Sequence, residues 1–385
     1  MPESVYIHIP FCEHICHYCD FTKFFYKESQ ADLYLEALKN EIVSNVPGSK
    51  QPVKTIYIGG GTPTVLTVEQ LNTLMTLIHD KFDVQGCREF TIEANPGDID
   101  VDKIQLLRDF GVNRVSLGVQ VLDDDMLVQL GRAHRVSDVY TTVNRLQQHG
   151  LNNISIDLIY ALPHQTPEHF QKTVNEAVAF NLPHYSTYAL QIEPKTVFYQ
   201  RHQKGQLHRP PEEAEVAMYD ILKSTMTKNG LHQYEISNFA KPGFESQHNL
   251  MYWNNAYYYG FGAGAHGYLP GRRIGNLKPL PAYIKQANAD GHPVLRTESI
   301  GLKEEVEEEF FLGLRKMEGV NKNRFKERFG FSHKQLYATP IEVLKQKGWL
   351  QEDEEWIRLT EEGVLFGNSV FAHFLLEESD IKHVR

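Results

Sequence analysis

Three cysteines near the start of the chain, Cys12, Cys16 and Cys19, have the spacing Cys-x3-Cys-x2-Cys and follow a short apolar stretch at residues 5–9. Thiolates are soft ligands that suit iron–sulfur chemistry, and three of them can hold three corners of a cubane [4Fe-4S] cluster. The fourth iron then has no protein ligand, so a chelating small molecule can bind there. The spacing therefore predicts a [4Fe-4S] site in the loop after the first strand.

Two other interpretations of this cysteine loop remain open. A structural zinc site is closed and four-coordinate, and His8, His14 or His17 could supply its fourth ligand. The three cysteines could also bind no metal. The remaining cysteine, Cys87, stands alone, so the four cysteines cannot form a disulfide framework, and they fit a reducing compartment.

Length and charge limit the classes of protein that the chain can belong to. Its 385 residues favour one large domain with an appendage. A net charge of −10 argues against nucleic acid as a partner. The first residues lack the basic and apolar pattern of a leader, and no apolar run reaches about 18 residues. We therefore expect a cytoplasmic protein whose contact with membranes is at most peripheral.

Stretches typical of strands and helices alternate six times within residues 1–230. The predicted strands are residues 5–9, 55–58, 89–93, 113–118, 153–158 and 184–190. The predicted helices are residues 30–46, a helix opened by a capping box at 67–70, 101–110, 136–149, 167–180 and 212–229. Such alternation predicts right-handed βαβ units around a parallel sheet. The expected fold class is α/β, an incomplete TIM-like (β/α)6 barrel with its chemistry at the C-terminal ends of the strands.

The regular alternation stops after Gly230. Residues 231–303 are rich in Tyr, Asn, Gly and His, and we expect a loop-rich extension that closes the open side of the barrel. Residues 304–385 are predicted to form a helical, winged-helix-like α+β domain with a hairpin near residues 353–360. The acidic run within residues 304–309 is expected to be a solvated helix face.

Polar residues follow several of the predicted strands, where a ligand site would need them. The glycine-rich stretch Gly59–Thr64 comes directly after the second strand and allows a close approach of backbone to a ligand. Glu93 ends the third strand and Gln120 follows the fourth. Asp157 interrupts an otherwise apolar strand, and burying a carboxylate without a partner is costly. We expect these side chains to meet at one rim of the barrel.

Several of these motifs together resemble the radical SAM superfamily, named after S-adenosylmethionine (SAM). The stretches that carry the resemblance are Tyr6–Cys12, the cysteine loop, Gly59–Thr64, Gly118–Gln120 and Ile156–Pro163. They look most like oxygen-independent coproporphyrinogen oxidases and their paralogues, the HemW-type haem chaperones, over nearly the whole chain. The resemblance implies that SAM occupies the open iron. The SAM contacts that it implies are Tyr6, Tyr18, Gly60, Gly61, Thr62, Glu93, Gln120, Arg132, Asp157 and, on a looser alignment, Gln191.

Three features separate the two relatives. The oxidases carry a further cysteine where this chain has Phe21, and they have a long arm before the cluster where this chain has eleven residues. The stretch His248–Trp253 matches the His-Asn-x-x-Tyr-Trp motif of the HemW-type chaperones. This motif implies haem binding in the 231–303 extension, with His248 as the candidate iron ligand and His266 as its rival. If the resemblance is set aside, a single histidine among aromatic residues is more typical of a hydrogen-bonded structural residue than of a ligand.

The sequence therefore predicts a haem chaperone with a radical SAM core, which binds haem and transfers it to acceptor proteins, respiratory proteins among them. The alternative is a coproporphyrinogen III oxidase, and a zinc-held protein-interaction scaffold is the third hypothesis. Whether the protein is an enzyme that cleaves SAM reductively stays open at this stage. The exposed loops are also compatible with a homodimer.

Overall fold

The computed structural model describes residues 2–382 and 384, and its central feature is a mixed sheet of twelve strands. The strand order is β11-β12-β10-β9-β8-β7-β5-β1-β13-β14-β15-β16. Seven neighbouring strands are parallel: β1 (Ser4–Ile9), β5 (Thr55–Gly60), β7 (Glu89–Ala94), β8 (Arg114–Gln120), β9 (Ile154–Tyr160), β10 (His184–Ala189) and β13 (Tyr258–Phe261). The two edge strands, β11 and β16, do not pair with each other, so the barrel is incomplete, as the sequence predicts.

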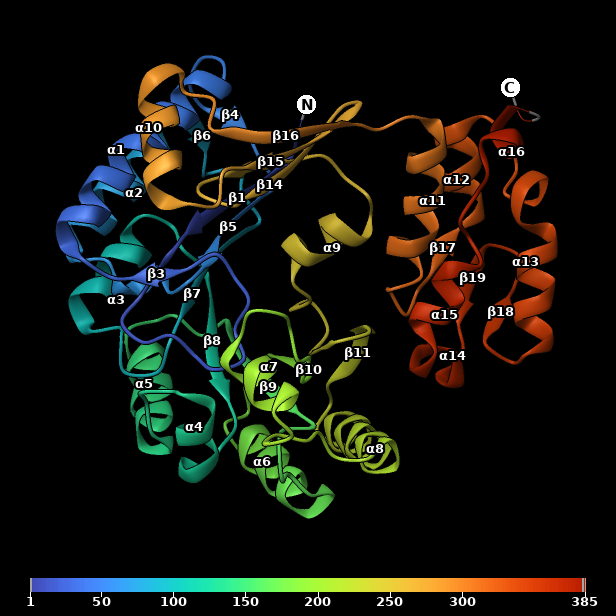
Figure 1. Ribbon diagram of the computed structural model, residues 1–385, viewed down its shortest axis with the longest axis horizontal. Helices are drawn as coiled ribbons and strands as arrows, with labels where there is room; N and C mark the ends of the chain where they lie inside the picture. The colour runs from blue at the N-terminus through green and yellow to red at the C-terminus, as the bar shows by residue number, and fades with distance from the viewer. Residues whose placement is uncertain (1, 383, 385) are drawn as a thin grey trace.

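Six helices connect the first six parallel strands and follow the last of them. They are α1 (Glu28–Asn45), α2 (Val68–Lys81), α3 (Val101–Asp109), α5 (Val136–Gln148), α6 (Pro167–Ala179) and α8 (Glu212–Lys228), and they form the outer layer (Figure 1). Local signals begin several of them, as at α2, where Thr67 and Gln70 form a capping box. Every predicted strand and helix of residues 1–230 is present to within a few residues, so the α/β barrel fold is confirmed.

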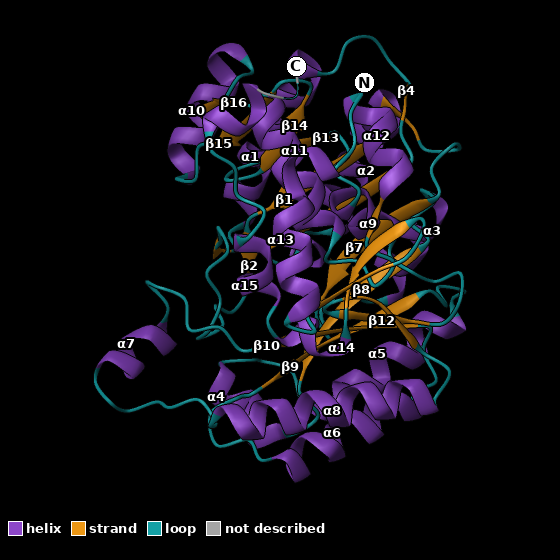
Figure 2. Ribbon diagram, turned by 90° about the vertical axis from the view of Figure 1, so that its right-hand side faces the viewer, coloured by secondary structure: helices purple, strands orange, loops and turns teal. Residues whose placement is uncertain are grey.

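The shorter elements of the barrel lie in its connections. They are β2 (Phe11–Cys12), β3 (Phe24–Phe25), β4 (Gln51–Pro52), β6 (Phe82–Asp83), a 3-10 turn at Pro63–Val65, α4 (Asp124–Leu130) and α7 (Val197–Gln203). The segment that contains α7 protrudes from the rest of the molecule (Figure 2). None of the described helices is long and apolar enough to cross a lipid bilayer.

The extension at residues 231–303 is largely regular, which corrects the expectation of a loop-rich segment. It contains β11 (His232–Glu235), β12 (Asn238–Ala240), α9 (Gln247–Trp253), β13, β14 (His266–Leu269), β15 (Arg272–Asn276), α10 (Leu280–Asp290) and β16 (Val294–Ser299). The segment extends the sheet at both edges, because β12 pairs with β10 and β13 pairs with β1. Helix α9 lies on the inner face of the sheet, opposite the helical layer (Figure 1). These strands are short and rich in Gly and Tyr, so their local pattern resembles that of loops.

The C-terminal unit has its own hydrophobic core, centred on Phe310, Phe325, Tyr337 and Ile357. Its elements are α11 (Leu302–Gly313), β17 (Val320–Asn321), α12 (Lys322–Phe329), α13 (Lys334–Gln346), β18 (Leu350–Glu352), β19 (Trp356–Leu359), α14 (Glu361–Leu365), α15 (Gly367–Ala372) and α16 (Glu378–Lys382). The three strands form an antiparallel sheet in the order β17-β19-β18. Helices followed by a hairpin agree with the predicted winged-helix-like arrangement.

The acidic face of α11 is only partly solvated, and this corrects the sequence-based expectation. Glu307 and Glu309 are each 6% exposed. Glu307 accepts a hydrogen bond from the backbone of Leu376, and Glu309 pairs with Arg328 at 2.7 Å. These carboxylates therefore join α11 to the rest of the C-terminal unit.

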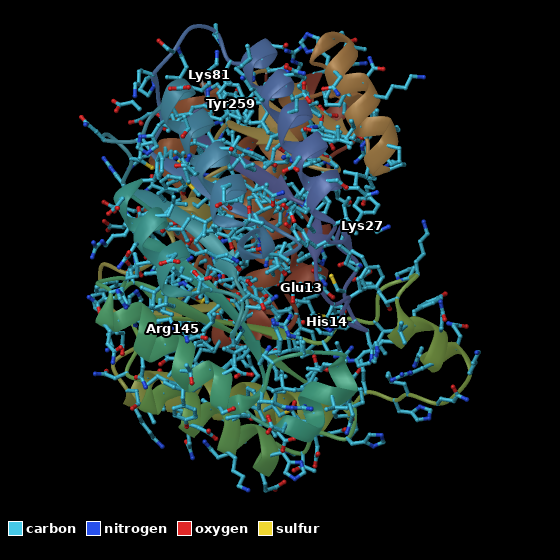
Figure 3. All side chains as sticks on the ribbon, turned by 90° about the vertical axis from the view of Figure 1, so that its left-hand side faces the viewer. Glu13, His14, Lys27, Lys81, Arg145 and Tyr259 are labelled. Carbon is cyan, nitrogen blue, oxygen red and sulfur yellow. The ribbon has the colours of Figure 1, made fainter. Side chains whose placement is uncertain are left out.

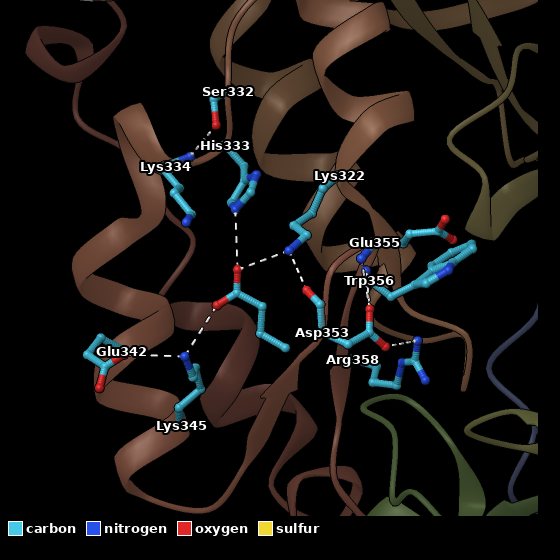
Figure 4. Close-up of polar contacts among 11 residues, drawn as sticks. Lys322, Ser332, His333, Lys334, Glu342, Lys345, Asp353, Glu355, Trp356 and Arg358 are labelled. Atoms are coloured by element: carbon cyan, nitrogen blue, oxygen red, sulfur yellow. Dashed lines mark hydrogen bonds and ion pairs between the residues drawn. The ribbon is translucent and has the colours of Figure 1, made fainter.

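A second polar cluster fixes the hairpin of this unit. Figure 4 shows Lys322, Lys345 and His333, which converge on the end of β18. Glu352 lies 3.4 Å from the Nζ of Lys322, 3.3 Å from that of Lys345 and 3.9 Å from the Nε2 of His333. Burial would raise the pKa of Glu352, but hydrogen bonds from the two lysines outweigh it and lower the pKa.

Candidate cofactor and ligand site

The C-terminal ends of the parallel strands surround a cavity of about 440 Å³, here called the main cavity. The three predicted cluster ligands, Cys12, Cys16 and Cys19, line it. Nearly all of the residues predicted to contact SAM line it too: Tyr18, Gly60, Gly61, Thr62, Glu93, Gln120, Arg132, Asp157 and Gln191. Tyr6 does not; it lines an adjoining cavity of about 380 Å³, here called the second cavity. The barrel therefore brings residues from distant parts of the chain to one rim.

The cysteine loop offers three free thiols to the main cavity. Thr62 donates to the Sγ of Cys12 at 3.7 Å, and the guanidinium of Arg132 donates to the Sγ of Cys16 at 3.4 Å. Burial raises the pKa of Cys12 to about 11, whereas the Thr62 hydrogen bond lowers it. Bound iron would itself deprotonate such a thiol. Figure 3 shows Glu13 and His14 of this loop at the surface, beside the protruding segment of α7.

In the described part of the chain, the same loop is not arranged around a single metal ion. Within residues 2–382 and 384, no three His, Cys, Asp or Glu side chains are grouped so that they could hold one metal ion. The ring of His8 bonds Tyr6 and the carbonyl of Thr22, and the Nδ1 of His17 bonds the carbonyl of Gln129. A cubane cluster is larger than one ion, so its sulfur ligands need not converge on one point. The donor set therefore fits a cluster better than a structural zinc ion.

Contacts within the protein fix the conformation of the glycine-rich stretch Gly59–Thr64. Gly60 has a φ of +118°, and a Cβ there would lie 2.5 Å from the ring of His8. A Cβ at Gly61 would lie 2.6 Å from the carbonyl oxygen of Phe11. The amide of Gly60 donates to Glu93 at 2.9 Å and that of Gly61 to the carbonyl of Ile9, also at 2.9 Å. Close packing between β1, β5 and β7 therefore requires glycine at these positions. The same packing brings the cysteine loop against the ends of the strands.

Two carboxylates lie deep in the main cavity. Glu93 accepts hydrogen bonds from the hydroxyl of Tyr57 and the amide of Gly60, yet burial raises its pKa to about 7. Asp157 accepts from Ser116 at 3.1 Å, and burial raises its pKa as well. The cost of burying a lone carboxylate is thus reduced by hydroxyl groups of neighbouring strands. Either carboxylate can accept a hydrogen bond from a cationic ligand.

Arg132 is held at the rim by groups that the sequence did not single out. Its Nη2 donates to the Oδ1 of Asn95 at 2.6 Å and to the carbonyl of Gly118. Asn95 also donates to Thr62, so it links two predicted SAM contacts. Gln120 has a φ of +71° at a β-bulge between β8 and β9. Such a conformation is rare for glutamine, and strained positions of this kind cluster at functional sites. Asn95 directly follows the third strand, and this position at a strand end could have identified it as a candidate site residue.

His248 lies in the interior and does not line either cavity. Its side chain is 1% exposed, its Nδ1 lies 2.8 Å from the hydroxyl of Thr55, and its Nε2 lies 2.8 Å from the hydroxyl of Tyr252. Burial lowers its pKa to about 3. The start of α9 is fixed by Glu89, which accepts from the backbone amides of Gln247 and His248. Both ring nitrogens are therefore engaged within the protein.

His266, the rival candidate, has a different environment. It begins β14, its side chain is exposed, and it lines the second cavity. Burial lowers its pKa first, and the nearby charges of Arg296 and Lys278 lower it further. The two candidate haem ligands thus differ in access to solvent.

Comparison with known proteins agrees with this geometry. A family model described as the Radical SAM superfamily matches residues 6–177, and one described as the HemN C-terminal domain matches residues 300–366. The solved structure of Escherichia coli coproporphyrinogen III oxidase (HemN), described as a radical SAM enzyme, superposes with a TM-score of 0.84. The match covers 97% of this chain and 90% of that one at 24% identity, and it shows a shared fold.

Relatives with higher identity match the chain over its length. A Bacillus subtilis protein named Heme chaperone HemW is 48% identical over 377 residues, which are 97% of this chain and 100% of the relative. The Escherichia coli protein of the same name is 33% identical over 383 residues, which are 98% of this chain and 99% of the relative. The chain therefore belongs to the HemW family of the radical SAM superfamily.

Proposed function

We propose that the protein is a haem chaperone, which binds haem and transfers it to acceptor proteins in the cytoplasm. The observation that carries this proposal is the full-length 48% identity to a relative named Heme chaperone HemW. Phe21 supports it, because the resemblance to the oxidases would place a further cysteine at that position. Respiratory haem proteins are the acceptors that we would test first.

The proposal includes a [4Fe-4S] cluster and SAM, which membership of the superfamily implies. Cys12, Cys16 and Cys19 would hold the cluster, and a bound, reduced cluster can supply an electron to SAM. Arg132 would bind the carboxylate of SAM through a charge-assisted hydrogen bond. Glu93 would accept a hydrogen bond from its ammonium group. Arg132 can serve this purpose because Asn95 already fixes the direction of its guanidinium.

The first test is reconstitution of the whole chain under anaerobic conditions. We expect about four irons per chain and an electron paramagnetic resonance (EPR) signal of the reduced cluster that SAM perturbs. Stoichiometric zinc without iron would contradict both the chaperone and the oxidase hypotheses.

The second test separates a carrier from an enzyme. Reconstituted protein is titrated with haem, and the complex is mixed with apomyoglobin as a model acceptor. We expect a Soret band on titration and transfer of haem to the apoprotein. In parallel, the protein is incubated with coproporphyrinogen III, SAM and reductant. Formation of protoporphyrinogen would instead support the oxidase, whose fold the chain shares.

A further inference from the structure

The second cavity contains the features of a haem site. Its volume of about 380 Å³ lies within the range of ligand pockets. It adjoins the main cavity, because Asp20, Phe21, Gly60 and Glu93 line both. One wall comes from the cysteine loop, and the other comes from α9 and the turn between β13 and β14. A ligand in this cavity would lie beside the proposed SAM site and would share Gly60 and Glu93 with it.

Two histidines line the second cavity, and they differ in whether a ring nitrogen is free to bind iron. The ring of His8 is 6% exposed, and both of its nitrogens contact the protein, at 2.9 Å from the hydroxyl of Tyr6 and 2.7 Å from the carbonyl of Thr22. His266 is exposed, and neither ring nitrogen has a hydrogen-bond partner among residues 2–382 and 384. Haem iron requires an imidazole nitrogen that is not already used. His266 meets this requirement and His8 does not.

Aromatic side chains form the apolar part of the second cavity. Phe21 lines the cavity and is 60% exposed, so its ring is accessible to a ligand. Opposite elements supply Tyr252 and Tyr258, whose rings meet edge to face with centroids 4.7 Å apart. Flat aromatic and apolar groups of this kind can pack on the faces of a porphyrin.

Positive charge lies beside His266. Lys278 lines the second cavity, and the charges of Lys278, Arg296 and Arg273 all act on the ring of His266, opposed by Glu298. Haem carries two propionates, which basic side chains at a cavity rim can bind through charge-assisted hydrogen bonds. Burial and these positive charges all lower the pKa of His266.

We propose that haem binds in the second cavity with His266 as an axial ligand, and that His248 is a positioning residue that fixes Tyr252 in its wall. This inference rests on the proposed haem-chaperone function and specifies where the haem lies. The hydrogen bond of 2.8 Å between the Nε2 of His248 and the hydroxyl of Tyr252 is the link between the His-Asn-x-x-Tyr-Trp motif and the cavity. The motif thus contributes to haem binding without ligating iron.

The test is haem titration of the reconstituted full chain and of His266→Ala, His266→Met and His248→Gln variants. We expect His266→Ala to lose the imidazole-ligated absorption and EPR signature, with an affinity at least about tenfold lower. Added free imidazole should restore the signature. His266→Met should produce the different spectrum of a thioether ligand. His248→Gln should keep the wild-type band position, even where its affinity falls.

Each result has a distinct meaning. If wild-type protein binds no haem, the proposed function itself fails. If wild-type protein binds haem and the His266→Met spectrum is unchanged, the inference is wrong while the function stands. A loss of the signature in His248→Gln that imidazole restores would make His248 the ligand instead. Iron content and the circular dichroism spectrum of each variant serve as controls for folding.

Discussion

Glu41 provides a sharp test of how the barrel core is held together. This residue of α1 is 3% exposed and accepts hydrogen bonds from the amide of Gly262 at 2.8 Å, the hydroxyl of Tyr283 at 2.5 Å and the side chain of Asn276 at 2.5 Å. It therefore joins α1 to α10, to β15 and to the turn beside the second cavity. The perturbation that we propose is Glu41→Gln, which keeps the shape and removes the charge.

The expected change in the free energy of unfolding follows from the pKa of Glu41. Burial raises it from 4.5 to about 7, although the three hydrogen bonds lower it. A carboxyl with a raised pKa in the folded state holds its proton between these pH values, while the unfolded chain has lost it. Its contribution to stability is therefore fully present below pH 4.5 and is lost as the pH rises through about 7. The difference of about 2.5 units corresponds to roughly 3 kcal/mol.

The assay is urea unfolding from pH 5 to pH 8, with Glu36→Gln as the control, an exposed glutamate on the same helix. We expect the free energy of unfolding of Glu41→Gln, relative to that control, to rise by up to about 3 kcal/mol across this range. Other buried carboxyls, Glu93 and Glu235, also have raised pKa values, so only the difference between variants is diagnostic. A difference that does not change with pH would refute the reasoning.

Three further predictions concern the site and the C-terminal unit. Gly60→Ala should destabilise the barrel by roughly 3 kcal/mol or more, because its Cβ meets His8, whereas Gly205→Ala, with open space around it, should cost about 1 kcal/mol in thermal unfolding. Arg132→Lys should weaken SAM binding by roughly tenfold in isothermal titration, since lysine lacks the planar fork that holds two partners at once. Equal affinities would contradict this role. Glu352→Gln should make the C-terminal unit more sensitive to limited proteolysis at pH 7, and unchanged cleavage would argue against the cluster in Figure 4.

Local periodicity was sufficient to predict the first six strands and their helices, because each unit is complete within a short stretch of sequence. Strand β13 could not be found in this way. It is four residues long, contains a glycine, and its parallel partner β1 lies at the other end of the barrel domain in sequence. Pairing between such distant segments has no local signal. The regular structure of residues 231–303 was missed for the same reason.

The candidate site was open to sequence prediction where a motif names the residue: Cys12 and Arg132 both line the main cavity, and their ligand roles stay predictions. It was not predictable where a side chain acts through a neighbour. Asn95 orients Arg132 by a single hydrogen bond, and the burial of His248 depends on the position of α9 against β5. The choice between His248 and His266 depends on which nitrogens are already bonded, and that information exists only in three dimensions.

The position of β1 between β5 and β13 has a consequence for biosynthesis. One side of β1 finds its partner soon after synthesis begins, but the other side stays uncovered until residues 258–261 have been made. At typical translation rates of 5–20 residues per second, this edge remains unpaired for roughly 12–50 s. Open edges can pair with foreign strands, so the nascent chain is exposed to aggregation during that interval. Ribosome-bound fragments that end before β13 should therefore aggregate on release, whereas those that extend beyond β16 should not.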